Sequence, residues 1–151
     1  MIKLQNVEKV YKSENGNVTA LNDINLEFES SGMVFVVGRS GSGKTTLLNI
    51  IGSLDHIDNG EVSVTFPNED EYNLSAASEK ELDEYRNLHV GFVFQEYNLL
   101  KDWSIRDNIL LPVRQQYTEG AEQEEEKILE QVLHETDLNI CLLYTSELPT
   151  I

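Results

Sequence analysis

The stretch MVFVVGRSGSGKTTLLNII, residues 33–51, decides the fold of this chain. Its centre, Gly38-Arg39-Ser40-Gly41-Ser42-Gly43-Lys44-Thr45, fits the pattern G-x-x-x-x-G-K-[ST] of a phosphate-binding loop. Glycines let successive backbone N–H groups point into one concavity, and the following helix directs its positive dipole end to the same place. Lys44 supplies an ammonium for the β- and γ-phosphates, and Thr45 supplies a hydroxyl for Mg²⁺. The sequence therefore predicts a site for nucleotide phosphates.

The residues on both sides of this loop predict the structure that such a site requires. Residues 33–37 form a continuous β-branched and aromatic run, which is typical of a strand buried on both faces of a parallel sheet. After the loop, apolar residues recur at helical spacing, at Leu47, Leu48, Ile50, Ile51 and Leu54. A strand, a glycine-rich loop and a helix in this order favour an α/β fold. The alternative is a glycine-rich turn with a solvated lysine.

The rest of the chain predicts further strands and helices. Residues 2–12 and 21–28 alternate as strands around the polar turn 13–17, which suggests an antiparallel pair. Residues 60–66 read as a short strand, and residues 90–94 as a second strand of the buried type. Capping patterns at Ser78 and Ser104 open two helices, the second complicated by Pro112. Residues 128–133 predict a last amphipathic helix behind an acidic run.

Composition excludes several classes of protein. The chain has 151 residues, 40% of them apolar, which is enough for one core and too many for a disordered acidic tail. A net charge of −16 argues against a nucleic-acid partner, yet it permits a phosphate ligand at one local site. A single cysteine excludes a disulfide framework, and the three histidines have no ligand or triad spacing. Without an apolar run of membrane length or a signal peptide, we expect a protein inside the cell.

Several segments in their order resemble the ATP-binding domain of ABC transporters. They are Tyr11, Ala20-Leu21, GRSGSGKTT at 38–46, LLNIIGSLD at 47–55 and GFVFQ at 91–95. The stretch GFVFQEYNLLKDWSIRDNILLP, residues 91–112, is similar to the subfamily that powers lipoprotein release and the export of macrolides or antimicrobial peptides. The resemblance implies a P-loop NTPase (RecA-like) core, an N-terminal antiparallel β subdomain and the start of a helical subdomain. It also implies ATP and Mg²⁺ as ligands.

The resemblance assigns roles to individual residues. Tyr11 lies where the family stacks an aromatic ring on adenine, although a core-packing strand residue is the alternative. Val18 would line the same adenine site. Gln95 matches the glutamine that reaches Mg²⁺ and the attacking water, although a polar residue ending a strand is the alternative. Lys44 and Gln95 are the predicted catalytic residues, Thr45 and Gln95 the predicted metal contacts, and Thr46 completes the phosphate-binding set.

The resemblance also implies partners. The family's helical subdomain meets a membrane permease subunit where Tyr97, Leu99, Leu100 and Trp103 lie in this chain. An exposed apolar patch there would mark an interface, whereas packing under the loop is the alternative. The family pairs two ATP-binding subunits, and it works on the cytoplasmic face of the cell membrane. We expect the same for the intact parent of this chain.

Family elements that follow the helical subdomain do not occur in the sequence. It has no LSGGQ signature, no apolar run ending in Asp-Glu and no switch histidine. We therefore expect residues 1–140 to be the N-terminal part of an ATP-binding domain, supporting ATP binding better than hydrolysis. A nucleotide-binding module without turnover, or a non-functional fragment, is the alternative; an unrelated P-loop kinase is a third.

The last eleven residues are a doubtful part of the sequence. Residues 141–146, CLLYTS, match one reading frame of the mosaic-end adapter of transposon-based sequencing libraries. We hypothesise that residues 141–151 are translated adapter. The alternative is that YTSEL, residues 144–148, is the family's own approach to its signature. Genomic DNA that continues differently after Ile140 would support the adapter hypothesis, and the same eleven codons in an intact genome would contradict it.

Overall fold

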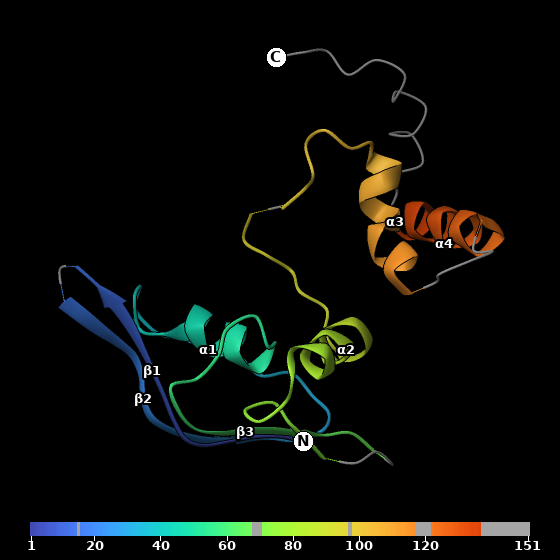
Figure 1. Cartoon of the computed structure of the whole chain (residues 1–151). Coiled ribbons are helices and arrows are strands. Elements are labelled where there is room, and N and C mark those ends of the chain that lie inside the picture. Colours follow the sequence, from blue (N-terminus) through green and yellow to red (C-terminus); the bar gives the residue numbers. More distant parts are fainter. Residues whose placement is uncertain (15, 68–70, 97, 117–121, 137–151) are drawn as a thin grey trace. The chain divides into compact units, whose positions relative to one another are not determined.

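A computed structural model describes residues 1–14, 16–67, 71–96, 98–116 and 122–136 of the chain (Figure 1). The chain divides into two compact units, Met1–Phe92 and Val93–Ile151. The first unit holds β1 (Ile2–Ser13), β2 (Gly16–Phe28), α1 (Lys44–Ile51), β3 (Asn59–Thr65), β4 (Glu71–Asn73) and α2 (Glu79–His89). The second unit holds α3 (Ile105–Gln116) and α4 (Glu122–Glu135). The hypothesis about residues 141–151 lies outside the described residues.

The first unit contains an antiparallel sheet with the strand order β2-β1-β3-β4. In the centre of the sheet, Ile2 lies opposite Phe28 of β2 and opposite Val64 of β3. The hairpin between β1 and β2 turns where Ser13 pairs with Gly16, and the Ser13 hydroxyl donates to the Gly16 carbonyl at 2.7 Å. The predicted antiparallel pair and the predicted strand near residues 60–66 are confirmed.

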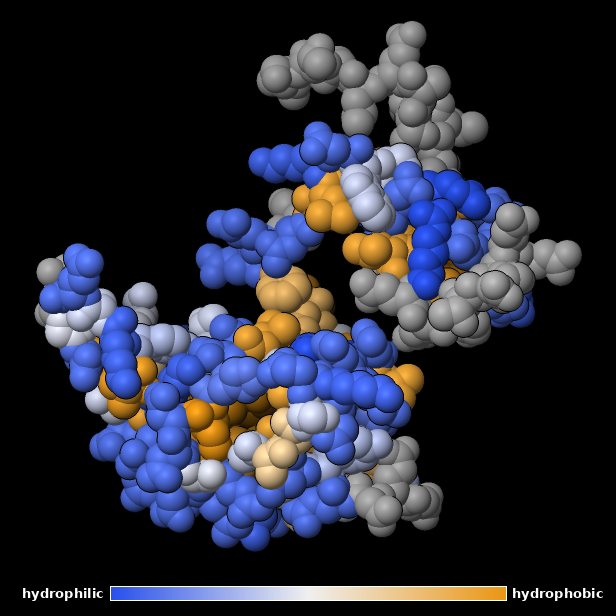
Figure 2. All heavy atoms as spheres, in the orientation of Figure 1, coloured by the Kyte–Doolittle hydropathy of each residue, from blue (hydrophilic) through white to orange (hydrophobic). Residues whose placement is uncertain are grey.

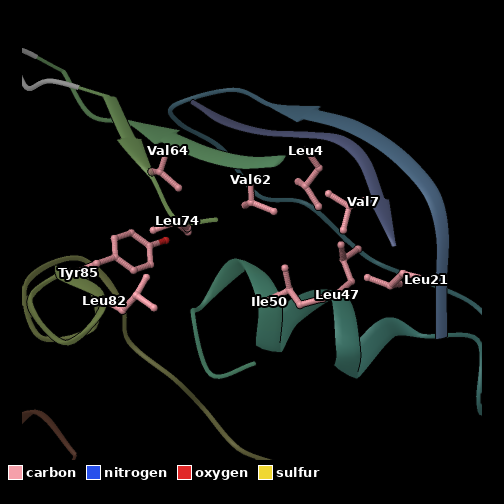
Figure 3. Close-up of a cluster of buried hydrophobic side chains, with 10 residues drawn as sticks. All are labelled: Leu4, Val7, Leu21, Leu47, Ile50, Val62, Val64, Leu74, Leu82 and Tyr85. Carbon is pink, nitrogen blue, oxygen red and sulfur yellow. The ribbon is translucent and has the colours of Figure 1, made fainter. Parts of the chain in front are cut away.

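The core of this unit lies between the sheet and helix α1 (Figure 3). Leu47 and Ile50 of α1 point toward Leu4 and Val7 of β1 and Val62 of β3. These five side chains are all buried, which explains the helical spacing of the apolar residues after the glycine-rich loop. The sheet therefore fixes the helix whose first turn follows that loop.

Helix α2 begins with the capping box that the sequence predicts. The Ser78 backbone N–H donates to Glu81 Oε2 at 2.8 Å, and the Glu81 N–H donates to Ser78 Oγ at 3.4 Å. Two side chains of α2 reach the end of α1: the Tyr85 hydroxyl donates to the Ile51 carbonyl at 3.0 Å, and Arg86 Nη1 donates to the Ser53 carbonyl at 2.6 Å. Helix α2 thus satisfies carbonyls that the end of α1 leaves without a helical partner.

Two expected elements are wrong: residues 33–37 and residues 90–94 do not form strands. Val36 and Val90 pack partly against the core, but Val37 is 87% exposed and Val93 is fully exposed. A strand needs neighbouring strands to bond its backbone N–H and C=O groups, and a continuous apolar run needs cover on both faces. Neither segment belongs to the four-stranded sheet that the described residues form, so the expected parallel sheet is not formed among them.

The second unit is a pair of helices with a small core of its own. Leu110 of α3 and Leu129 and Leu133 of α4 are buried against one another. Helix α3 begins where the Asp107 N–H donates to Ser104 Oγ at 3.1 Å, so the weaker capping pattern is confirmed. The helix continues past Pro112 to Gln116. Among the described residues, no helix is long and apolar enough to cross a bilayer.

Candidate functional site

The glycine-rich loop leads into helix α1 through residues with left-handed backbone. Gly41 has a φ of 77° and Gly43, the N-cap of α1, has a φ of 86°. A Cβ atom at Gly43 would lie 2.4 Å from the Ala20 carbonyl oxygen of β2, which is closer than real Cβ contacts come. Glycine at this position is therefore required twice, by the backbone conformation and by the close approach of the strand.

Lys44 lies across this loop. Its Nζ donates to the Gly38 carbonyl at 3.0 Å and to the Arg39 carbonyl at 2.7 Å. The first turn of α1 holds no acidic residue, so no carboxylate of that turn competes for its backbone N–H groups. The backbone of the loop, the Lys44 ammonium and the N-terminus of α1 together create a region of positive electrostatic potential.

A hollow of about 240 Å³ lies beside this loop. Tyr11 and Val18, which are opposite each other in the β1–β2 hairpin, form one side of it. Ala20 and residues 41–46 line the rest. The structure thus brings the two predicted adenine-side residues and most of the predicted phosphate-side residues into one site. Gly38, Arg39 and Ser40 lie earlier in the same loop, and the roles of all these residues stay predictions.

The predicted metal contacts belong to different units of the chain. Gln95 belongs to the second unit, and its role as a catalytic residue and metal contact stays a prediction. Thr45, the other predicted metal contact, lies in the first unit, and its role also stays a prediction. Among the described residues, no group of three or more His, Cys, Asp or Glu side chains could hold a metal ion. His56 instead lies 3.4 Å from Glu79, as measured between Nε2 and Oε1.

The predicted partner patch is only partly described. Tyr97 lies outside the described residues, whereas Leu99, Leu100 and Trp103 are exposed large apolar side chains. Asn108 of α3 shapes this loop, because its Oδ1 accepts from the Leu100 N–H at 2.8 Å and its Nδ2 donates to the Leu100 carbonyl at 3.1 Å. The role of the patch as a contact for a permease stays a prediction.

Sequence reasoning missed two residues next to the hollow, Lys9 and Asp55. Asp55 Oδ2 accepts from the Tyr11 hydroxyl at 2.7 Å, and Asp55 Oδ1 accepts from Lys9 Nζ at 2.6 Å. Burial by itself raises the pKa of the Asp55 carboxyl, but hydrogen bonds from Lys9, Tyr11 and the His56 backbone together bring that pKa below its usual value. The period of a strand places Lys9 and Tyr11 on one face. No local sequence pattern connects them with Asp55, which lies much further along the chain.

Comparisons with known proteins point to one family. The family profile described as ABC transporter matches residues 21–145. The bacitracin export ATP-binding protein BceA of Halalkalibacterium halodurans is 37% identical over 75% of this chain and 43% of its own length. The lipoprotein-releasing system ATP-binding protein LolD of Bacteroides fragilis is 40% identical over 74% of this chain and 48% of its own length.

Solved structures give the same result. The ATP-binding cassette MJ0796, solved as a dimer in a post-hydrolysis state bound to ADP and Pi, is similar with a TM-score of 0.74 and 36% identity. The match covers 86% of this chain and 55% of that structure's chain. The chain thus spans about half the length of the relatives that it matches.

Proposed function

Since the chain belongs to the ABC transporter family, we propose that it binds MgATP as part of an ATP-binding subunit. The intact subunit would couple ATP binding and hydrolysis to the export or release of a substrate at a membrane. The single observation that supports this proposal is the hollow in which Tyr11 and Val18 lie beside residues 41–46. It combines an apolar, aromatic side for a base with a positively polarised side for phosphates.

The residues of the hollow fit the ligand. Gly43 admits the close approach of backbone that a phosphate cradle needs, and the first turn of α1 holds no carboxylate that would repel a phosphate. Lys44 and the N–H groups of the loop would hold the phosphates, and Thr45 would hold Mg²⁺. Gln95, which belongs to the second unit, is the further metal contact that we propose. The bound metal neutralises phosphate charge, which is the chemistry that phosphoryl transfer needs.

The partners and place of action are part of the same proposal. BceA and LolD are named as ATP-binding proteins of an export system and of a lipoprotein-releasing system, and MJ0796 was solved as a dimer. For this chain we infer a second ATP-binding subunit and a membrane permease subunit, the latter meeting Leu99, Leu100 and Trp103. The site of action would be the cytoplasmic face of the membrane.

Calorimetric titration of the purified chain with MgATP tests the proposal. We expect saturable binding that Lys44→Ala weakens at least tenfold, because a charge-assisted contact to phosphate is lost. Lys80→Ala, on the exposed side of α2, removes the same side chain away from the hollow and should bind like the unaltered chain. The absence of MgATP binding, or equal binding by Lys44→Ala, would contradict the proposal.

Phosphate release by the same samples separates two forms of the proposal. Turnover that Lys44→Ala abolishes would mean that the chain acts as an ATPase by itself. Binding without turnover would mean that the chain is a nucleotide-binding module. The printed sequence, which has neither a signature motif nor an apolar run ending in Asp-Glu, favours the second result.

A further inference from the structure

The segment that follows helix α1 is hydrogen-bonded along strand β1. The Asp58 N–H donates to the Glu8 carbonyl at 2.9 Å, and Asp58 Oδ2 accepts from the Val10 N–H at 2.6 Å. Between these contacts, Lys9 Nζ donates to the His56 carbonyl at 2.6 Å. Residues 55–58 therefore lie against the same strand that carries Tyr11.

Asp55 is the member of this segment that reaches Tyr11. Its two carboxylate oxygens are used separately, Oδ2 by the Tyr11 hydroxyl and Oδ1 by the Lys9 ammonium. The side chains of Lys9 and Asp55 are only 12% and 25% exposed, so this ion pair is largely shielded from water. The Lys9 ammonium also lies over the Tyr11 ring, 5.2 Å from its centroid.

Tyr11 needs such an anchor. Its side chain is 41% exposed at the rim of the hollow, so packing restricts its rotamers less than it would restrict those of a buried ring. A hydrogen bond from its hydroxyl to a carboxylate that is itself held by Lys9 selects one orientation of the ring. The chain that carries the carboxylate begins at the phosphate-binding loop, because α1 runs from Lys44 to Ile51 and Asp55 follows it closely.

We propose that Asp55, together with Lys9, is a positioning residue that holds the Tyr11 ring at a fixed place relative to the phosphate-binding loop, ready for the adenine of ATP. This inference rests on the proposed function and deepens it. Asp55 itself touches no part of the nucleotide. It acts by removing the entropy cost of ordering an exposed aromatic side chain when the base arrives.

The test compares two ligands that share a triphosphate, of which only one has a base. Tyr11→Phe keeps the ring and removes its hydroxyl, and Asp55→Asn removes the charge that holds both partners. Calorimetry on the whole chain should show that each variant binds MgATP about three- to tenfold more weakly, which is the cost of ordering one side chain. Binding of magnesium tripolyphosphate should remain within about twofold, because no base is present to stack.

Matched controls separate positioning from a general structural effect. Tyr72→Phe makes the same chemical change at a ring that packs on Phe66, away from the hollow, and should leave both affinities unchanged. Adding Asp55→Asn to Tyr11→Phe should cost less than Asp55→Asn does alone, because the hydrogen bond between the two is already lost. If Asp55→Asn is too unstable to titrate, Tyr11→Phe alone carries the test, since it leaves the Lys9–Asp55 pair in place.

Several outcomes overturn the inference. Unchanged MgATP binding by Tyr11→Phe would show that the hydroxyl positions nothing, while the proposed ATP site would stand. An equal loss of MgATP and tripolyphosphate binding in Asp55→Asn would show a purely structural role. An unaltered chain that binds both ligands equally would overturn this inference alone, because the base would add nothing to the affinity. An unaltered chain that binds neither ligand would overturn the proposed function and this inference with it.

Discussion

Strands β1–β3 and the apolar segment 33–37 are both rich in β-forming residues, yet only the former are strands. Residues of β1 pair with β2 on one side and with β3 on the other, and the buried side chains of β1, Leu4 and Val7, belong to the same core as Leu47 and Ile50 of α1. Segment 33–37 is more apolar than β2 or β3, the two strands that pair with β1. Four of its side chains are nevertheless exposed, those of Met33, Val34, Phe35 and Val37. Figure 2 shows apolar side chains at the surface of the molecule.

The difference teaches that β-propensity is a preference for a paired and half-covered surface. The apolar side chains of β1 are covered within the described residues, because the same chain supplies helix α1 to pack on them. A continuously apolar segment forms a strand only when other elements cover both of its faces. For segment 33–37, the described residues supply only partial contacts, at Val36. Substitutions that are chemically the same should therefore have very different effects in the two regions.

The largest difference is expected for glycine-to-alanine substitutions at Gly43 and Gly91. Gly43→Ala should lower the free energy of unfolding by about 3 kcal/mol, because a left-handed residue acquires a Cβ that meets the Ala20 carbonyl. Gly91→Ala, in the segment 90–94, meets nothing within 4 Å and should change stability by less than about 0.5 kcal/mol. Urea unfolding monitored by circular dichroism measures both values; equal losses would break the comparison.

The same contrast separates what the sequence could predict from what it could not. The loop at residues 38–45, its helix, the antiparallel pair and both helix caps depend on local patterns, and each was predicted. The strands at 33–37 and 90–94 were wrong because a local pattern cannot report whether a neighbouring strand is present. Asp55 was missed for a related reason, since its contact with Tyr11 joins residues that are far apart in the chain and belong to no common period.

The second prediction concerns two valines of the first unit. Val62 of β3 is 1% exposed, whereas Val37 is 87% exposed. Val62→Ala removes two buried methyl groups at about 0.8 kcal/mol each and leaves a small cavity, so a loss of about 2 kcal/mol is expected. Val37→Ala should cost less than about 0.5 kcal/mol. The midpoints of urea unfolding check both; a comparable loss at Val37 would show that segment 33–37 is covered in solution.

A smaller effect on the free energy of unfolding is expected from a change in pH. Segments 33–37 and 90–94 contain no titratable side chain, so they cannot contribute to this effect. The pKa of Asp55 is lower in the folded chain than its usual value of 3.8, so folding favours the charged form. Its contribution to stability is present above pH 3.8 and is lost as the pH falls through the lower folded pKa.

Asp55→Asn isolates this contribution. The difference in unfolding free energy between the unaltered chain and Asp55→Asn should be constant above about pH 5 and should shrink below it, since only the carboxylate titrates there. Urea unfolding at several pH values between about 3 and 7 measures the difference. A difference that grows as the pH falls has the wrong sign and would show that the charged form of Asp55 does not stabilise the folded chain.

The smallest effect on folding, but a visible one on association, is expected for Val37→Lys. Because Val37 is exposed, a lysine there should change the free energy of unfolding by less than about 0.5 kcal/mol. The exposed apolar run 33–37 nevertheless offers β-forming backbone and apolar surface to other copies of the chain, and a charge within such a run opposes their pairing. Static light scattering should therefore show less self-association for Val37→Lys than for the unaltered chain.

Leu88→Lys, at an exposed apolar residue near the end of α2, introduces the same charge outside the run and serves as the matched control. If both lysines reduce self-association equally, the change in net charge is the cause, and segment 33–37 contributes no more to association than the rest of the surface. If only Val37→Lys reduces it, segment 33–37 associates with other copies of the chain, as an unpaired strand would.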